Sequence, residues 1–205
     1  MKNAFTLFGG AAAIALALAA CQTSAQAPAK TAATAAPPIS SGAVPVAAMF
    51  DKDGKFLIPE GRDRWPAVGT TYALSYEGDG GTTFNTVRMD PASYEAYVKT
   101  GKFPVGTMLA LEVRRPVTEI APAKGGQTQG ATVGQSIHVK DEKAGPGTWT
   151  FYGFSGNAKT GNPIARSQAC YACHEQHAKE DTVFTQYYPS LKEAQAASAK
   201  AAGGQ

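Results

Sequence analysis

The most constraining feature of this 205-residue chain is the sequence Cys170-Tyr171-Ala172-Cys173-His174, which lies close to the C-terminal end. C-x-x-C-H is the attachment sequence of a c-type haem, in which two thiols bond to the porphyrin and the adjoining histidine binds the iron. If the segment is helical, the cysteines lie about one turn apart on one face and the histidine follows them. We therefore predict one covalently bound haem c, attached through Cys170 and Cys173, with His174 as the proximal iron ligand.

Three other interpretations of the cysteine pair are weaker. A redox dithiol or half of a zinc site can also begin with C-x-x-C, but neither requires the histidine that follows. The chain has no second cysteine pair that could complete four zinc ligands. The remaining alternative is a disulfide in an exported protein.

Residues 1–20 have the pattern of a bacterial signal peptide, a positively charged start followed by an apolar run rich in alanine and leucine. The run ends in Leu18-Ala19-Ala20-Cys21, which resembles the lipobox, where cleavage precedes a cysteine that then becomes lipidated. The haem motif uses two of the three cysteines, so Cys21 would otherwise be a free thiol in an oxidising compartment. The sequence thus predicts a periplasmic protein with lipid on Cys21. An ordinary secretory signal, cut near Ala20 or after Ala27, is the alternative.

Composition divides the rest of the chain. Residues 21–48 are rich in Ala and Pro with almost no large apolar side chains, which predicts a disordered tether. Residues 49–191 form the predicted haem domain, and residues 192–205 are expected to be a flexible tail. The net charge of +3 is small and its basic residues are scattered, which argues against binding to nucleic acid. We expect contact with a membrane through the lipid anchor only.

Within the predicted domain the patterning is mostly that of β-strands. Strands are expected at 70–76 and 84–89, at 108–114, near 136–140 and around 149–151, with a Gly- and Gln-rich loop at 127–135. Asp90 and Pro91 open a helix that Gly101 closes. The fold class we predict is mainly β (α+β), an antiparallel sheet with a few helices and the haem segment after the sheet.

A series of short blocks runs through residues 49–191. In order they are Trp65 with Gly69-Thr70-Thr71-Tyr72, Asn85-Thr86-Val87-Arg88, Phe103-Pro104-Val105-Gly106-Thr107, Trp149-Thr150-Phe151, the C-x-x-C-H sequence, and Asp181-Thr182-Val183-Phe184 with Tyr188-Pro189. Their order and the late haem motif resemble the cytochrome P-460 family, which includes the β-sheet cytochromes c′ (cytochrome c′-beta). The resemblance implies a mainly antiparallel sheet, commonly dimeric, and a five-coordinate c-type haem whose open face binds small molecules. Activities in the family range from hydroxylamine oxidation to the binding of nitric oxide.

Few side chains could bind the iron from the side opposite His174, which favours five-coordination. His177 follows by three residues and belongs to the proximal side of a helix, where a surface position or contact with a propionate is expected. The strand methionines are more typical of a core. Glu112, His138 and Lys140 occupy alternating polar positions, so each is either a distal proton carrier or a solvated surface residue.

Other expectations concern the haem surroundings. Phe84, Phe103 and Leu111 could cap the iron, and Arg88 could pair with a propionate. In the hydroxylamine-oxidising members of the family, a lysine is joined covalently to the porphyrin, in the strand after the Phe-Pro-x-Gly turn. Here residues 108–112 contain no lysine, and surface positions are the ordinary explanation for the nearby Lys99, Lys102 and Lys140.

Three functional hypotheses follow. The first is a haem protein with an open coordination position that binds small ligands such as nitric oxide, served by a periplasmic electron-transfer partner. The second is an oxidoreductase that acts on hydroxylamine or a related nitrogen compound, and the third is an electron carrier with six-coordinate iron. The thin supply of axial ligands disfavours the third hypothesis, and the missing lysine disfavours the second, so whether the protein is an enzyme stays open.

Overall fold

The computed structural model describes residues 46–74, 81–144 and 148–204. The expected signal peptide, Cys21 and the tether up to residue 45 lie outside the described residues. Among those that are described, no helix combines the length and the apolar character needed to cross a bilayer.

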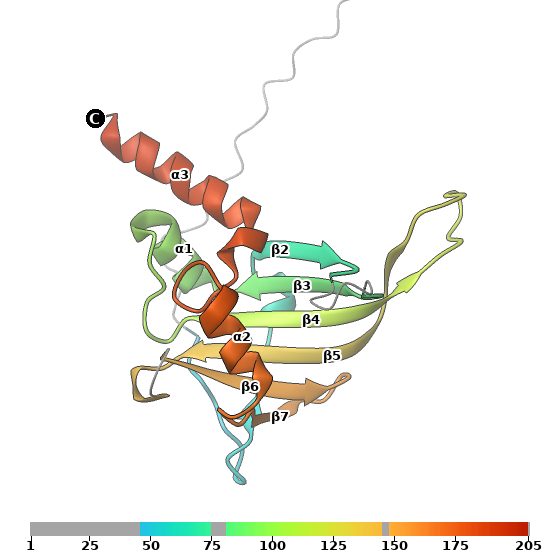
Figure 1. Cartoon of the computed structure of the whole chain (residues 1–205), viewed down its shortest axis with the longest axis horizontal. Coiled ribbons are helices and arrows are strands. Elements are labelled where there is room, and N and C mark those ends of the chain that lie inside the picture. The colour runs from blue at the N-terminus through green and yellow to red at the C-terminus, as the bar shows by residue number, and fades with distance from the viewer. Residues whose placement is uncertain (1–45, 75–80, 145–147, 205) are drawn as a thin grey trace, which may run out of the picture. The chain divides into compact units, whose positions relative to one another are not determined.

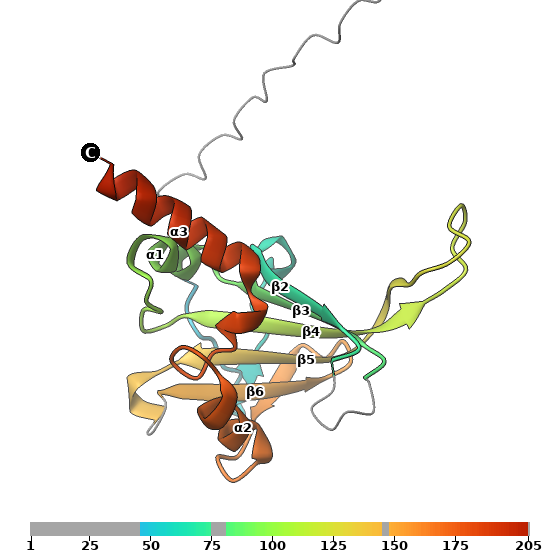
Figure 2. The ribbon, with the colours of Figure 1, turned by 45° about the horizontal axis from the view of Figure 1, so that its top comes forward.

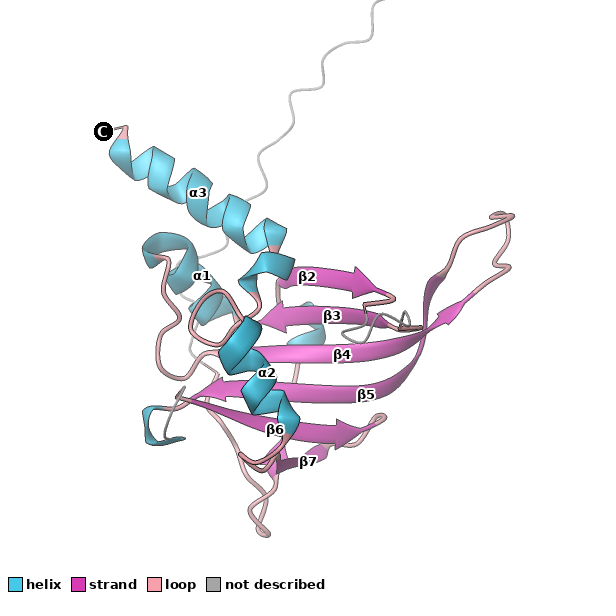
Figure 3. Cartoon of the chain, in the orientation of Figure 1, coloured by secondary structure: helices cyan, strands magenta, loops and turns pink. Residues whose placement is uncertain are grey.

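The centre of the fold is a single antiparallel sheet of seven strands (Figures 1 and 3), as the patterning predicts. The strand order across the sheet is β1-β7-β6-β5-β4-β3-β2. The strands are β1 (Phe56–Leu57), β2 (Ala67–Tyr72), β3 (Phe84–Met89), β4 (Met108–Val117), β5 (Thr128–Lys140), β6 (Trp149–Ser155) and β7 (Thr160–Pro163).

The two faces of the sheet are covered by different parts of the chain, because successive side chains on a strand point to opposite faces. One set of buried residues includes Leu109, Trp149 and Phe151, and it packs against side chains from all three helices. We call this side the helix face. The other set includes Met108, Ala110, Ile137 and Val139 and packs under the N-terminal segment that carries Phe56, Ile58 and Trp65. We call that side the opposite face.

The expected loop at 127–135 is wrong, because residues 128–135 belong to strand β5. They form the outer half of a long hairpin with β4, in which Arg114 lies opposite Thr132 and Pro116 opposite Gln129. Figure 1 shows this hairpin extending beyond the rest of the sheet. Half of residues 128–135 are exposed, and the others are partly buried apart from the buried Gln135. A polar composition is therefore compatible with a strand whose backbone hydrogen bonds are satisfied by its neighbour.

The helices are α1 (Pro91–Thr100), α2 (Ala169–His177) and α3 (Pro189–Gly203). Helix α1 begins and ends where the sequence predicts, with Asp90 at its N-terminus and Gly101 in the left-handed conformation at its C-terminus. Helix α3 differs from the flexible tail expected at 192–205. Its first turn carries the fully buried Leu191, and the helix runs beside α1 (Figure 2), so tertiary contacts support its first turns.

Asp90 generates a prediction about stability. Its carboxylate is buried and accepts hydrogen bonds from the backbone N–H groups of Ser93, at 2.9 Å, and Met108, at 2.8 Å. Asp90→Ala should lower the free energy of unfolding by about 2–4 kcal/mol, because a helix cap is lost and a buried N–H is left unpaired. The matched control is Asp51→Ala, which removes two similar bonds from an exposed turn and should cost less than about 1 kcal/mol. Urea unfolding would measure both, and equal effects would contradict the analysis.

Candidate haem-binding site

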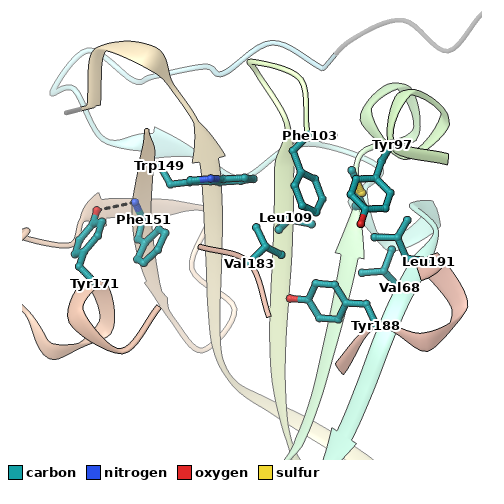
Figure 4. Close-up of a cluster of buried hydrophobic side chains, with 11 residues drawn as sticks. Val68, Tyr97, Phe103, Leu109, Trp149, Phe151, Tyr171, Val183, Tyr188 and Leu191 are labelled. Atoms are coloured by element: carbon teal, nitrogen blue, oxygen red, sulfur yellow. Dashed lines mark hydrogen bonds between the residues drawn. The ribbon is translucent and has the colours of Figure 1, made fainter. Parts of the chain in front are cut away.

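Helix α2, which carries the C-x-x-C-H sequence, is fixed to the helix face by Tyr171. The ring of Tyr171 stacks on that of Phe151 in β6, with centroids 4.2 Å apart and planes 2° from parallel. The backbone N–H of Phe151 donates to the Tyr171 hydroxyl at 2.9 Å (Figure 4). The thiols of Cys170, which is exposed, and Cys173, which is half-buried, are both free. As predicted, the segment is helical and the two cysteines lie about one turn apart.

His174 is held in one orientation with one ring nitrogen free. Its Nδ1 lies 2.7 Å from the backbone carbonyl oxygen of Thr182. A carbonyl can only accept, so Nδ1 carries the proton and Nε2 keeps its lone pair. Burial lowers the pKa of His174, while the bond to Thr182 acts in the opposite direction. The imidazole is therefore neutral near pH 7, the form in which histidine binds metals.

The ring of His174 borders a pocket on the helix face with an empty volume of about 750 Å³. Side chains from strands β2 to β6 and from the segment after α2 line it, and most of them are apolar. Its lining residues include Val87, Leu109, Leu111, Phe151 and Phe184. Gly69 is a special case, since a Cβ at this position would collide with the carbonyl oxygen of Tyr187. The glycine thus lets the segment after α2 lie directly on β2.

These residues fit a haem. The site combines a neutral imidazole with a free Nε2, two thiols in the preceding turn of the same helix and an apolar pocket next to them. Trp149 adds a further observation. Its indole Nε1 is buried in the pocket wall and has no hydrogen-bond partner among the described residues, so a polar group of a bound molecule could accept from it.

His138 lies in this pocket, beside His174. Its ring stacks on Phe151, with centroids 3.7 Å apart, and lies 5.1 Å from the ring of His174. Ser136 Oγ is 3.4 Å from its Nε2. Burial, together with the nearby His174, lowers the pKa of His138 to about 3. His138 is therefore a neutral, half-buried side chain in the pocket next to His174, and not the solvated surface residue that was one of the two expectations.

Glu112 lies on the opposite face and does not line this pocket. Its carboxylate accepts from Arg114 at 2.8 Å and from Thr132 at 3.0 Å. Burial by itself would raise the pKa of Glu112, but these hydrogen bonds outweigh it and the pKa is lowered. Arg88 also lies on that face and donates to the carbonyl oxygen of Trp65, which is at odds with a role at a propionate. The expectation that Glu112 serves the haem pocket is not supported.

Lys140 lies on the same face as His138 but outside the pocket lining. Its Nζ donates to the carbonyl oxygen of Phe103 at 2.8 Å and pairs with Asp181 Oδ2 at 2.7 Å. Lys99 and Lys102 are exposed. No lysine is among the pocket-lining residues in the described part of the chain.

The other residues that the sequence singled out lie partly in the pocket and partly outside it. Leu111 lines the pocket, whereas Phe103 is buried in the core beside it and the ring of Phe84 contacts that of Tyr72 in a tilted arrangement. His177 is exposed at the end of α2. Met89 and Met108 are buried in the two cores, as expected for strand methionines.

Sequence reasoning missed Thr182 and Trp149. The contribution of Thr182 is a backbone carbonyl, which no residue-type pattern can reveal. A signal for Trp149 was present, because a buried tryptophan normally finds a partner for its N–H, but the lack of one becomes visible only once the neighbours are known.

Comparison with known proteins identifies one family. The model of the cytochrome P-460 family matches residues 59–185, a range that contains the sheet, helix α2 and the segment that follows it. No curated protein matches this chain.

His138 generates a prediction about acid stability. Its pKa of about 3 in the folded protein lies below the ordinary value of 6.5, so only the unfolded chain takes up this proton between those values. The resulting stability is fully present above pH 6.5 and is lost as the pH falls, by at most about 1.4 kcal/mol per pH unit. Urea unfolding of the haem-loaded protein at pH 7 and pH 5 should show a larger loss for the wild type than for His138→Phe. Equal losses would contradict the prediction.

Proposed function

The chain belongs to the cytochrome P-460 family and is a haem protein, and on this basis we propose a specific role for it. The protein carries a single haem c, attached through Cys170 and Cys173, with His174 as the only protein ligand of the iron. The open coordination position binds small neutral ligands such as nitric oxide.

The observation that carries this proposal is the arrangement of the two pocket histidines. His174 has its Nδ1 engaged by Thr182, which leaves Nε2 for the iron. His138 is stacked on Phe151 on the same wall as His174, so it is poorly placed to bind an iron from the other side. Among the other described residues of the lining there is no histidine, methionine, lysine or cysteine. This supply of ligands supports one protein ligand and one open position.

The pocket walls favour a small, uncharged ligand. A bound haem supplies an iron that coordinates diatomic molecules and changes its redox state. Val87, Leu109 and Leu111 surround the space with apolar surface, which disfavours charged molecules that would have to leave water. Thr71 and Asn85, paired across β2 and β3, are polar lining residues that could orient a ligand by hydrogen bonding.

No observation favours the hydroxylamine-oxidising alternative over ligand binding. In the family that activity goes with a lysine joined to the porphyrin, and Lys140 is instead engaged by Asp181 and Phe103. A role as a six-coordinate electron carrier would need a second axial ligand, and the one other histidine of the described lining, His138, is stacked on Phe151 next to His174. Reduction of the iron would still require an electron-transfer partner in the same compartment.

We also propose export to the periplasm and a lipid anchor on Cys21, supported by the lipobox-like sequence and by the known placement of c-type haem outside the bacterial cytoplasm. The native protein should fractionate with membranes, and Cys21→Ser should abolish lipid modification. Mass spectrometry of the mature N-terminus is the measurement. A mature N-terminus downstream of residue 21 would contradict the lipid anchor and would indicate ordinary secretion to the periplasm.

One set of spectra tests the haem proposal. The haem should stay with the denatured protein through acid-acetone extraction, and the Cys170→Ala, Cys173→Ala double variant should lose it. The ferrous protein should bind carbon monoxide and nitric oxide rapidly, because no side chain has to leave the iron first. His138→Leu serves as the control and should leave the coordination number unchanged. A low-spin, six-coordinate ferrous spectrum, or binding that accelerates greatly in His138→Leu, would refute the open position.

A further inference from the structure

We propose that the tight turn at residues 180–183 is a positioning device for the axial imidazole. Lys140 and Asp181 are the positioning residues, and they set the reduction potential of the iron through this turn. The inference rests on the proposed role of His174 as the iron ligand.

The turn has a backbone conformation that its residues do not favour. The N–H of Val183 donates to the carbonyl oxygen of Glu180 at 2.7 Å, and between them Asp181 and Thr182 have φ values of 48° and 57°. Positive φ at both central residues is the type I′ pattern, which normally uses Asn and Gly. For the β-branched Thr182 it is a strained conformation. Such residues persist where their surroundings hold them, and they cluster at functional sites.

An ion pair fastens the turn to the sheet. Asp181 Oδ2 lies 2.7 Å from Nζ of Lys140, which also donates to the carbonyl oxygen of Phe103 at 2.8 Å. The Lys140 side chain is only 18% exposed, so its ammonium group has a defined location rather than a solvated one. Lys140 is on β5, two residues beyond His138, and therefore connects the turn to the strand that borders the pocket.

A second set of contacts holds the start of the turn. Glu180 pairs with Lys192 of α3 at 2.6 Å and accepts from the hydroxyl of Tyr97 of α1. Burial would raise the pKa of Glu180, but the hydrogen bonds from Lys192 and Tyr97 lower it, so the carboxylate is charged. Val183, at the other end, is buried in the core of the helix face. The turn is thus held from the sheet, from two helices and from the core.

Together these contacts fix the direction of the backbone carbonyl group of Thr182. Thr182 presents its carbonyl oxygen to Nδ1 of His174 at 2.7 Å. A hydrogen bond at this nitrogen raises the basicity of the metal-binding nitrogen and so favours the ferric state. Because the acceptor belongs to the backbone, its aim depends on the turn conformation and hence on the ion pair of Asp181 with Lys140.

The test uses the haem-loaded protein and begins with Asp181→Asn. Asparagine has a similar shape, tolerates positive φ and leaves the bond from Lys140 to Phe103 in place. We expect the ferrous-to-ferric ratio at a fixed potential to rise about threefold to tenfold, where tenfold equals about 59 mV for one electron. The iron–histidine stretching band of the ferrous protein should move to lower frequency in resonance Raman spectra.

Lys140→Met separates positioning from simple charge effects. Removing an anion near the iron raises the midpoint reduction potential of the iron, and removing a cation lowers it. A purely Coulombic influence therefore predicts opposite shifts of this potential for Asp181→Asn and Lys140→Met. Positioning predicts an upward shift in both, with a double variant no larger than one single variant. Lys140→Arg should restore much of the wild-type value.

A control and three outcomes complete the test. Glu112→Gln disrupts a half-buried ion pair with Arg114 on the opposite face and should leave the midpoint unchanged. Opposite shifts in the two single variants, or a Glu112→Gln shift as large as that of Asp181→Asn, would overturn the inference. So would wild-type values in all variants, although His174 ligation would then stand. A wild type without an iron–histidine band would instead refute the proposed function itself.

Discussion

The hydrogen bond between His174 and the carbonyl of Thr182 is the constraint on which the site depends. It determines which imidazole nitrogen carries the proton and therefore which one can bind a metal. It also connects helix α2, which bears the cysteines, to the segment that closes the pocket over β2. One short contact thus specifies the tautomer, the ring orientation and the position of the pocket wall together.

The two faces of the sheet carry different candidate polar residues. Strand β5 places His138 and Lys140 on the helix face and Ile137 and Val139 in the opposite core. Glu112, on β4, falls on the other side from Leu109 and Leu111, which line or border the same pocket as His174. Because successive side chains on a strand point to opposite faces, the position of a polar residue along its strand decides which face it occupies. Only residues on the helix face can reach the pocket.

Aromatic stacking carries much of the connection between the sheet and α2. Phe151 lies between Tyr171 on one side and His138 on another, and its own backbone N–H is bonded to the Tyr171 hydroxyl. This arrangement removes His138 from water, which lowers its pKa. The hydroxyl of Ser136, 3.4 Å from Nε2 of His138, is the polar group beside the ring. The same contacts that fix helix α2 also keep the imidazole of His138 neutral and close to His174.

The sequence by itself determined the features that depend on local order along the chain. These are the C-x-x-C-H segment on a helix, the bounds of α1 between Asp90 and Gly101, the antiparallel strands and the family. Tertiary structure alone decided the rest. Residues 128–135 became a strand because β4 satisfies their backbone, and α3 persists where α1 supports it. Whether Glu112, His138 and Lys140 approach the pocket depended on face and on distant partners such as Asp181. The Thr182 carbonyl was beyond prediction, because every residue has one and only the fold determines where it points.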